Sequence, residues 1–337
     1  MHICASRHDR KESLGLVASL QILLGLMCLG LGGDALVRGA VGIAQKLKIS
    51  PLVTGLVLVG FGTSTPELAT SVNAVINGAP GIAVGNVIGS NVANVLLILG
   101  VTAAIYPIAT QPAVFKRDAP VLAIATLVFV ALAFQGEFGR LSGVAFVTLL
   151  LAYIGFTYVT DRKAQDAQAE IHIAEAGLIA PAAKTLWIST LIAVAGVALV
   201  ILGANTIVAG SVSIARIFGI SEAIIGLTIV AIGTSLPELA ASVAAAFRKQ
   251  TDIALGNIIG SNIFNILAII GVTSLIKPIA IPQNVVSYDL WILLIATALL
   301  FLAAFTDARL SRREGVVFLG LYVAYIVFLS VRATGAM

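Results

Sequence analysis

Charged side chains are scarce in this sequence. Only 11% of its 337 residues are Asp, Glu, Lys or Arg, whereas about 25% is usual in soluble proteins. Apolar residues make up 59% of the chain, and the mean hydropathy is +1.06. A soluble enzyme, a nucleic-acid-binding protein and a disordered protein are therefore excluded. A polytopic membrane protein remains, because a spanning helix needs roughly 20 apolar residues and the chain has room for about ten.

Cysteine and histidine are also rare. Cys4 and Cys28 are too few for a disulfide framework or a sulfur-ligated metal site. The three histidines, His2, His8 and His172, lie outside the apolar stretches. Zinc or copper transport and a His-based proton relay are therefore not expected. The isoelectric point of about 9.2 does not indicate a nucleic-acid partner, since Lys and Arg collect on the cytoplasmic loops of membrane proteins.

Ten apolar stretches, separated by charged or turn residues, predict ten transmembrane helices. They lie at 14–44, 50–77, 80–105, 117–135, 139–160, 184–216, 220–247, 250–275, 286–306 and 311–333. Residues 1–13 form an N-terminal tail, and the polar segment 161–183 is predicted to be a soluble linker that can be partly helical. A cleaved secretory signal is the alternative for the first stretch. It is disfavoured because the stretch is long and continues in an internal repeat.

The distribution of Lys and Arg predicts the orientation of the chain. When the loops are numbered alternately, 13 of these residues fall on one side and 7 on the other. The larger group is expected in the cytoplasm. We therefore expect a multi-pass protein of the plasma membrane (the inner membrane in a bacterium), with both termini outside and the linker 161–183 in the cytoplasm.

An internal repeat divides the chain into two halves. Residues 55–101 begin GLVLVGFGTSTPELATSV, and residues 226–272 begin GLTIVAIGTSLPELAASV. The two segments align without a gap at an offset of 171, with 26 of 47 positions identical. The homologous halves are therefore about 14–160 and 184–333.

Each half has five predicted spans, and because that number is odd the halves must insert with opposite orientation. The expected fold class is thus an all-α polytopic membrane protein with ten transmembrane helices as two inverted five-helix repeats. In transporters with this architecture, the ion sites lie near the midplane where the repeats meet.

Two acidic residues, Glu67 and Glu238, lie mid-span at corresponding positions, each in a Gly-Thr-Ser-x-Pro-Glu motif. A carboxylate at membrane depth costs at least about 2.5–3.5 kcal/mol on insertion scales, so a matched pair indicates a function. A structural carboxylate bonded to a helix backbone is the alternative. Pro66 and Pro237 lack an N–H and disrupt the helix, so nearby carbonyls can face a cavity as ligands. These are the carbonyls of residues such as Gly60, Thr63, Ala231 and Thr234.

Hydroxyl and amide side chains accompany the two carboxylates. Thr63 and Thr234 each precede a glutamate by four residues and share its helix face. Ser64 and Ser235 add hydroxyls one position further on. The third span of each half carries a polar stripe at every fourth position: Asn86, Ser90 and Asn94, then Asn257, Ser261 and Asn265.

Contact between helices is the alternative reading of such a stripe. For Asn86 and Asn257 the two readings are balanced, and Asn91 and Asn262, which lie off the stripe, are expected to join helices. The candidate ligands are all oxygen atoms. This set suits hard cations such as Ca²⁺ and Na⁺ and not soft metals.

These motifs resemble those of a known family. Paired G-T-S-x-P-E segments, each followed by G-N-x-I-G-S-N-x-x-N, are similar to the two repeats of the sodium/calcium exchangers of the Ca²⁺:cation antiporter superfamily, in their compact prokaryotic form. The resemblance covers essentially the whole chain. It implies Ca²⁺ coordination by Glu67 and Glu238 with the carbonyls of Thr63 and Thr234. It implies Na⁺ sites that share these groups and add Ser64, Ser90, Asn94, Ser235, Ser261 and Asn265, with carbonyls near Gly60 and Ala231.

Some relatives carry Asp at one of the positions filled here by Asn94 and Asn265, so this chain lacks a third carboxylate. The Gly-Asn-x-x-Glu motif of cation/proton members is absent. The expected function is antiport of one Ca²⁺ against three Na⁺ by alternating access. Exchange of Ca²⁺ for H⁺, or another cation/proton antiport, is the alternative.

Other classes of function are disfavoured. A channel would conduct without a counter-ion, and an enzyme would need a nucleophile and base, yet no His or Cys lies near Ser64 or Ser235. We therefore expect no enzymatic activity and no cofactor. The expected partners are Ca²⁺ and Na⁺ as transported ions and the lipid bilayer, with no nucleic acid, and the protein is expected to function as a monomer.

Overall fold

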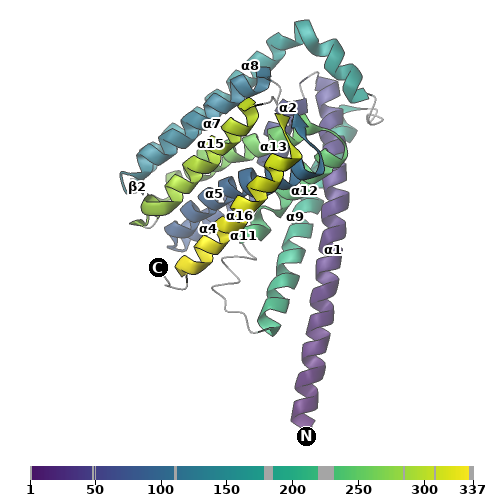
Figure 1. Ribbon diagram of the computed structural model, residues 1–337, viewed down its shortest axis with the longest axis vertical. Coiled ribbons are helices and arrows are strands. Elements are labelled where there is room, and N and C mark those ends of the chain that lie inside the picture. The colour runs from purple at the N-terminus through teal and green to yellow at the C-terminus, as the bar shows by residue number, and fades with distance from the viewer. Residues whose placement is uncertain are drawn as a thin grey trace.

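The structure is a computed structural model of the chain. It describes residues 2–47, 49, 51–109, 112–177, 185–218, 231–283, 285–306 and 309–333. Nearly all of these residues are helical, and the helices form a bundle with the long helix α1 along one side (Figure 1).

The elements of the two halves follow the same order. The first half contains α1 (His2–Leu47), α2 (Pro51–Thr54), η1 (Gly55–Gly60), α3 (Phe61–Thr63), α4 (Thr65–Ile76), α5 (Pro80–Ala93), η2 (Asn94–Ile98), α6 (Leu99–Ile105), β1 (Ile108–Ala109), α7 (Pro112–Ala133), β2 (Glu137–Phe138) and α8 (Arg140–Gly177). The second half contains α9 (Leu186–Ile217), α11 (Ala231–Thr234), α12 (Leu236–Phe247), α13 (Thr251–Phe264), η4 (Asn265–Ile270), α14 (Gly271–Ile276), β3 (Ile279–Ala280), η5 (Val285–Asp289), α15 (Leu290–Thr306), β4 (Arg309–Leu310) and α16 (Arg312–Ala333). The segments η1, η2, η4 and η5 are π-helical.

These bounds refine the expected spans. Residues 2–13, predicted as a tail, continue α1. The fifth span does not end at residue 160, since α8 runs on through residues 161–177 of the predicted linker. Residues 178–184 and the beginning of the seventh span, 220–230, lie outside the described residues. The second span, predicted as 50–77, is not one regular helix but is interrupted at Ser64.

The long helices α1 and α9 form a closely packed pair built on small residues (Figure 1). A Cβ atom added at Gly32 would lie 2.8 Å from the backbone nitrogen of Val200, and one added at Gly203 would lie 2.9 Å from that of Leu29. Both pairs follow the sequence offset of 171, so the repeat seen in the sequence is also a symmetry of the packing. Small residues at such an interface let two backbones approach closely.

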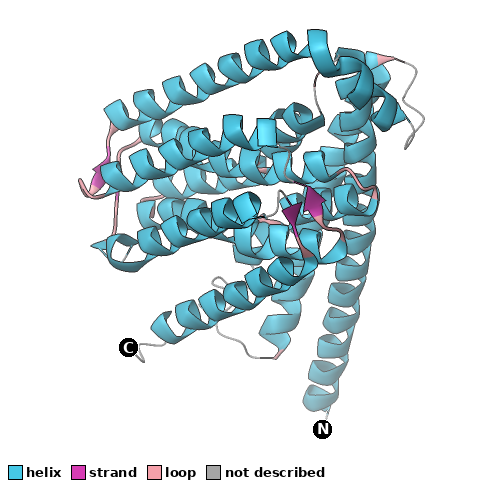
Figure 2. Ribbon diagram, turned by 45° about the horizontal axis from the view of Figure 1, so that its top comes forward, coloured by secondary structure: helices cyan, strands magenta, loops and turns pink. Residues whose placement is uncertain are grey.

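Two short antiparallel ladders lie at opposite ends of the bundle (Figure 2). In one ladder Ile108 of β1 pairs with Leu310 of β4, and in the other Ile279 of β3 pairs with Phe138 of β2. Ile279 is the repeat counterpart of Ile108. The two ladders therefore use corresponding segments of the two halves.

Each half also contains one aspartate at the start of its fourth predicted span. Asp118 is fully buried, and it accepts hydrogen bonds from Arg117 at 2.8 Å and from the hydroxyl of Tyr153 at 3.1 Å. Its counterpart Asp289 pairs with Arg332 at 2.9 Å. Each of these two carboxylates is thus paired with an arginine.

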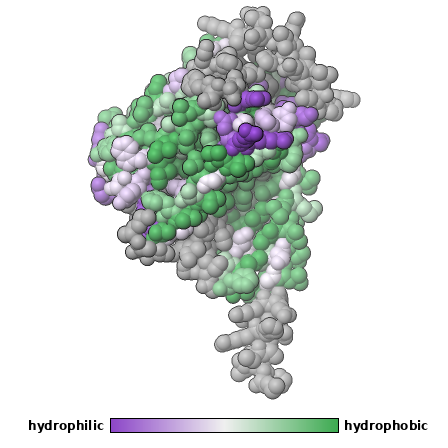
Figure 3. All heavy atoms as spheres, in the orientation of Figure 1, coloured by the Kyte–Doolittle hydropathy of each residue, from purple (hydrophilic) through white to green (hydrophobic). Residues whose placement is uncertain are grey.

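The described helices are long and apolar enough for a membrane. Seven of them meet the length and hydropathy expected of a span among the described residues. Figure 3 shows a continuous hydrophobic surface over the bundle, with hydrophilic residues gathered toward its left edge and its upper right. Large apolar side chains such as Leu141 and Trp187 are exposed on the described part of this surface. Such a belt is suited to lipid, and the fold is that of an all-α integral membrane protein.

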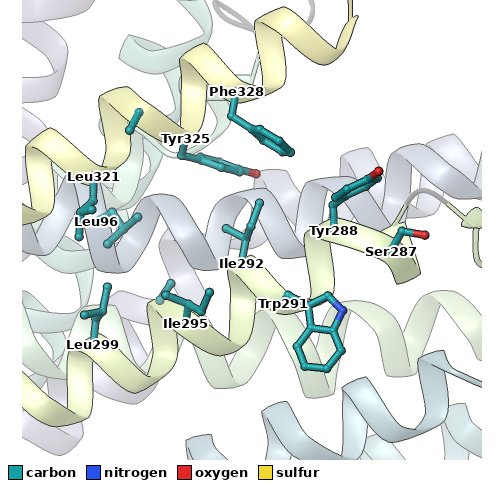
Figure 4. A pocket seen from close by; sticks show the side chains of 12 residues that line it. Leu96, Ser287, Tyr288, Trp291, Ile292, Ile295, Leu299, Leu321, Tyr325 and Phe328 are labelled. Carbon is teal, nitrogen blue, oxygen red and sulfur yellow. The ribbon is translucent and has the colours of Figure 1, made fainter. Parts of the chain in front are cut away.

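A hollow of about 430 Å³ lies between α15 and α16 (Figure 4). Its lining is almost wholly apolar and includes Trp291, Ile295 and Tyr325. No carboxylate lines it. It is therefore not the place where a cation would bind.

Candidate cation-binding site

The two predicted glutamates lie just beyond matched breaks in their helices. Ser64 stands between α3 and α4 with ψ of 7°, and Ser235 stands between α11 and α12 with ψ of 3°. The following prolines, Pro66 and Pro237, cannot donate to the carbonyls four residues earlier. Each glutamate therefore falls in the first turn of a short helix, where the exposed N–H groups and the helix dipole favour a negative charge.

The fold brings the two matched segments together at the centre of the protein. Glu67 and Glu238 are each only 1% exposed. The hydroxyl of Ser64 donates to Oε1 of Glu238 over 2.7 Å. A residue from the break of one half thus contacts the carboxylate of the other half.

Most oxygens in this region lack a protein hydrogen-bond donor. At the predicted site residues, six buried oxygens have no partner among the described residues: both carboxylate oxygens of Glu67, Oε2 of Glu238, Oγ of Ser235, and Oδ1 of Asn94 and Asn265. Leaving a buried carboxylate without a partner is strongly unfavourable. A group of such oxygens, contributed equally by both halves, is therefore suited to a cation.

Two asparagines hold the backbone of the glutamates in place. Asn86 donates from Nδ2 to the carbonyl of Glu67 over 3.2 Å and to Ser71 over 3.0 Å. Asn257 makes the matching bonds, to the carbonyl of Glu238 over 3.2 Å and to Ser242 over 2.8 Å. The amide groups thus link the third span of each half to the helix that carries the glutamate.

A second pair of asparagines orients the amides of Asn94 and Asn265. Asn94 donates from Nδ2 to Oδ1 of Asn262 over 2.9 Å, and Asn265 donates to Oδ1 of Asn91 over 3.1 Å. These bonds confirm that Asn91 and Asn262 join helices. They also occupy the donor ends of Asn94 and Asn265, so the acceptor ends remain free. A π-helical segment begins at each of these two residues, as is frequent at functional sites.

The remaining predicted residues are placed as follows. Thr63 is buried, and its hydroxyl lies 3.0 Å from the carbonyl oxygen of Val59. The carbonyl oxygen of Gly60 accepts bonds from the backbone N–H of Ser64 at 3.1 Å and from the hydroxyl of Ser261 at 3.2 Å. Ser90 is buried at 5% exposure. Thr234 is half-buried at the end of α11, and the side chain of Ala231 lies outside the described residues.

Close backbone contact sets the geometry around Gly60. A Cβ atom added at Gly260 would fall on the carbonyl oxygen of Leu56 and lie 2.8 Å from its Cα. Glycine at this position lets η1 pack directly against α13. That contact brings Gly60 within reach of the Ser261 hydroxyl.

Residue types alone did not identify Ser71 and Ser242 as part of the site. Each follows its glutamate by four residues and recurs at the offset of 171. That recurrence could have revealed them. Their role as partners of the asparagine amides depends on two helices lying side by side, which local sequence does not specify.

The arrangement defines a class of protein: an integral membrane protein with two carboxylates and several neutral side-chain oxygens buried between two structural repeats. Among the described residues, no group of three acidic, His or Cys side chains could hold a metal ion. The two glutamates are therefore the charged ligands available in the described site. Two carboxylates with hydroxyl and amide oxygens match the preference of hard cations.

The chain belongs to the sodium/calcium exchanger family. The family model described as sodium/calcium exchanger protein matches residues 17–159 and 188–331, one segment within each half of the sequence repeat. This result confirms the resemblance carried by the paired motifs.

Similar proteins come from bacteria and archaea. The putative antiporter CaxA of Alkalimonas amylolytica is 38% identical over 92% of this chain and 98% of its own length. The sodium/calcium exchanger MaX1 of Methanosarcina acetivorans is 35% identical over 92% of this chain and 97% of its own. A solved structure of the sodium–calcium exchanger NCX_Mj, soaked with Na⁺ and Sr²⁺, is 34% identical, has a TM-score of 0.78, and matches 93% of this chain and 98% of that chain.

Proposed function

We propose that the protein is a secondary antiporter that exchanges Ca²⁺ for Na⁺ by alternating access. The ions would bind between Glu67 and Glu238. The observation that carries this proposal is the group of free buried oxygens shared by the two halves. The relatives named sodium/calcium exchanger, which align over nearly the whole chain, support it.

The proposed ligands are those expected from the sequence. Ca²⁺ would be held by the two carboxylates with backbone carbonyls at Thr63 and Thr234. Na⁺ would use these groups together with three neutral side chains from each half. The neutral ligands are Ser64, Ser90, Asn94, Ser235, Ser261 and Asn265, with carbonyls near Gly60 and Ala231.

The family resemblance implies a ratio of three Na⁺ to one Ca²⁺, and the neutral ligands of the two halves would hold the third Na⁺. Two ionised glutamates are neutralised by one Ca²⁺ or by two Na⁺, and a third Na⁺ would leave one net positive charge. Moving that charge across the full field is worth about 2.3 kcal/mol per 100 mV, so voltage would bias the direction of exchange. With a negative cytoplasm, entry of Na⁺ would drive Ca²⁺ out.

The proposed topology has ten spans as two inverted halves, at 14–160 and 184–333, in a monomer of the plasma membrane. Both termini would lie outside, because the excess of Lys and Arg is then cytoplasmic. A C-terminal reporter that is active only in the cytoplasm should be silent. Reporter activity would overturn this orientation.

Ion flux into proteoliposomes tests the proposed function. Vesicles loaded with Na⁺ should take up Ca²⁺, and vesicles without Na⁺ should not. A pH gradient in the absence of Na⁺ is the matched arm, and uptake driven by it would favour Ca²⁺/H⁺ exchange instead. With potassium and valinomycin clamping the voltage, the initial rate should change with the imposed potential, and a rate indifferent to it would contradict the three-to-one ratio.

A further inference from the structure

One ion pair connects the long helix α1 to the helix that carries Glu238. Arg248, which follows the last residue of α12, donates from Nε to Oδ1 of Asp34 over 2.6 Å, and its Nη2 binds the same oxygen. Asp34 also pairs with Arg38, one turn further along α1, at 2.9 Å. The Arg248 side chain is 21% exposed, so this pair lies at the edge of the packed region.

The repeat counterparts of this pair carry no charge. At the offset of 171, Asp34 corresponds to Asn205 of α9, and Arg248 corresponds to Asn77 after α4. Asn205 is exposed. Asn77 donates its amide to Asn73 of its own helix at 2.8 Å. The symmetric packing of α1 against α9 supports this correspondence, because the glycine contacts there follow the same offset.

The helices next to these residues differ in how far they are covered. A Cβ atom added at Gly33 of α1 would lie 2.9 Å from the carbonyl oxygen of Ala240 and 3.1 Å from Cβ of Ala244. On α4, the counterparts Ala69 and Asn73 are exposed, while Ala240 and Ala244 are partly buried. The same difference holds one turn earlier, since Thr65 is exposed and its counterpart, Leu236, is partly buried. Thr65, Ala69 and Asn73 thus form an exposed stripe along α4.

The α1–α9 pair therefore covers α12 and leaves this stripe of α4 uncovered. In a protein with two inverted repeats, the state open to the opposite side arises when the two halves exchange their conformations. In that state α9 would cover α4, and α1 would move off α12. Asp34 and Arg248 would then separate, and the residues brought together in their place would be the uncharged Asn205 and Asn77.

We propose that Asp34 and Arg248 are positioning residues that hold the α12 side of the central site closed and thereby favour the state open along α4. The inference rests on the proposed alternating-access function. The charge distribution assigns the Arg248 end of α12 to the cytoplasm, so the favoured state opens to the outside. The pair exists in one of the two states, so its free energy contributes to the difference between them.

Cysteine labelling measures the equilibrium between these two states without any transport assay. In a background with Cys4→Ser and Cys28→Ser, single cysteines Asn73→Cys and Ala244→Cys report on α4 and α12. A membrane-impermeant maleimide is applied to right-side-out and to inside-out vesicles. We expect the cysteine at 73 to react quickly from the outside and the cysteine at 244 to react slowly from the inside.

The double variant Asp34→Asn with Arg248→Asn introduces the residue types of the other half. It should raise the labelling rate at position 244 about twofold to fivefold, as expected for a partly exposed ion pair. Arg248→Lys keeps the positive charge and should stay near the original rate. A rate at 244 that is unchanged in the double variant, or raised equally by Arg248→Lys, would overturn the proposal.

A transfer variant tests the same idea in the other half. Adding Asn205→Asp and Asn77→Arg to the double variant places the ion pair on α9 and α4. Labelling at position 73 should slow and labelling at 244 should stay fast. If both labelling rates remain as in the double variant, charge at these positions does not determine the equilibrium between the two states.

Two controls distinguish a change in the labelling rate from misfolding and from loss of transport. Thermal stability of each purified variant shows whether it is folded, and the single variant Arg248→Asn replaces the double variant if the latter is unstable. The labelling rates do not depend on which ions are carried. Failure of Na⁺-driven Ca²⁺ uptake would therefore refute the proposed function alone, whereas unchanged labelling would refute the ion-pair inference alone.

Discussion

The two halves of this protein share their motif but not their surroundings. Every residue of α13 from Ile253 to Ile263 is buried, whereas the corresponding face of α5 is open at Gly85 and partly exposed at Asn86. Gly260 is in close contact with the backbone of Leu56, while among the described residues no atom lies within 4 Å of a Cβ added at its counterpart, Gly89. Similar sequences therefore adopt one closed and one open environment in the same state.

The proposed alternating-access function gives this difference a physical reason. A transport site that opened to both sides at once would leak, so the two halves of an alternating-access protein take different conformations at any moment. Corresponding residues of the two halves then differ in their packing: those of the closed half are in contact with neighbouring helices, and those of the open half are more exposed. Pairs of matched substitutions can measure that inequality.

The largest effect is expected for the two glutamates, which are equally buried in the two halves. Glu67→Gln and Glu238→Gln should each reduce Ca²⁺ exchange by roughly a thousandfold, because a unit charge at about 4 Å is worth about 4 kcal/mol at an effective dielectric of about 20. Flux into proteoliposomes measures the loss. The exposed Glu137→Gln is the control and should exchange normally. Near-native exchange in either glutamate variant would remove that residue from the site.

Substitutions at the corresponding glycines Gly260 and Gly89 should show most clearly that the two halves differ in packing. Gly260→Ala places a methyl group against the backbone of Leu56, and such overpacking typically costs about 1–3 kcal/mol of stability. The methyl group of Gly89→Ala meets no atom of the described residues within 4 Å, and this substitution should leave thermal unfolding nearly unchanged. Melting of the two purified variants tests this, and equal destabilisation would mean that α5 and α13 are packed alike.

The serine pair should show a smaller inequality. Ser64 donates to Glu238 at 2.7 Å, whereas the hydroxyl of Ser235 has no partner among the described residues. A hydrogen bond to a charged group contributes about 1.5–3 kcal/mol. Ser64→Ala should therefore weaken the apparent affinity for Ca²⁺ about tenfold more than Ser235→Ala does. Equal affinities in a Ca²⁺-dependence series would contradict the asymmetry.

The asparagine pair should differ least. Asn257 is fully buried and Asn86 is partly exposed, although both make the same two bonds. Removing a buried amide leaves its partners unsatisfied at about 1–3 kcal/mol, and water can replace part of the loss at an exposed site. Asn257→Ala should lower the melting temperature by several degrees and Asn86→Ala by less. A larger drop for Asn86→Ala would reverse the assignment of the closed half.

Much of the site was predictable because its chemistry is local. Glu67 and Glu238 stand out since a carboxylate in an apolar segment needs a reason, and the prolines that interrupt their helices lie in the same motif. The free oxygens of Asn94 and Asn265 were within the predicted set. Their orientation was not, because it depends on Asn262 and Asn91 from the opposite half.

The helix bounds were less predictable. Residues 161–177 are polar, which indicates the end of a membrane span but not the end of a helix, since α8 continues through them. The break at Ser64 was signalled by Pro66. The π-helical segments at Asn94 and Asn265 had no such signal, because one inserted residue per turn leaves hydropathy unchanged.

The sequence by itself determined the membrane class, the repeat and the paired carboxylates, because hydropathy and identity are properties of residue types and their spacing. Only the tertiary structure decided which oxygens are free, which asparagines hold the glutamates, and which half is closed. Several of those features depend on residues far apart in the sequence, such as Ser64 with Glu238 and Asp34 with Arg248, and all of them depend on how separate helices pack. The two motifs are nearly identical, so the asymmetry arises from tertiary packing: α1 and α9 cover α12 and leave the corresponding residues of α4 exposed.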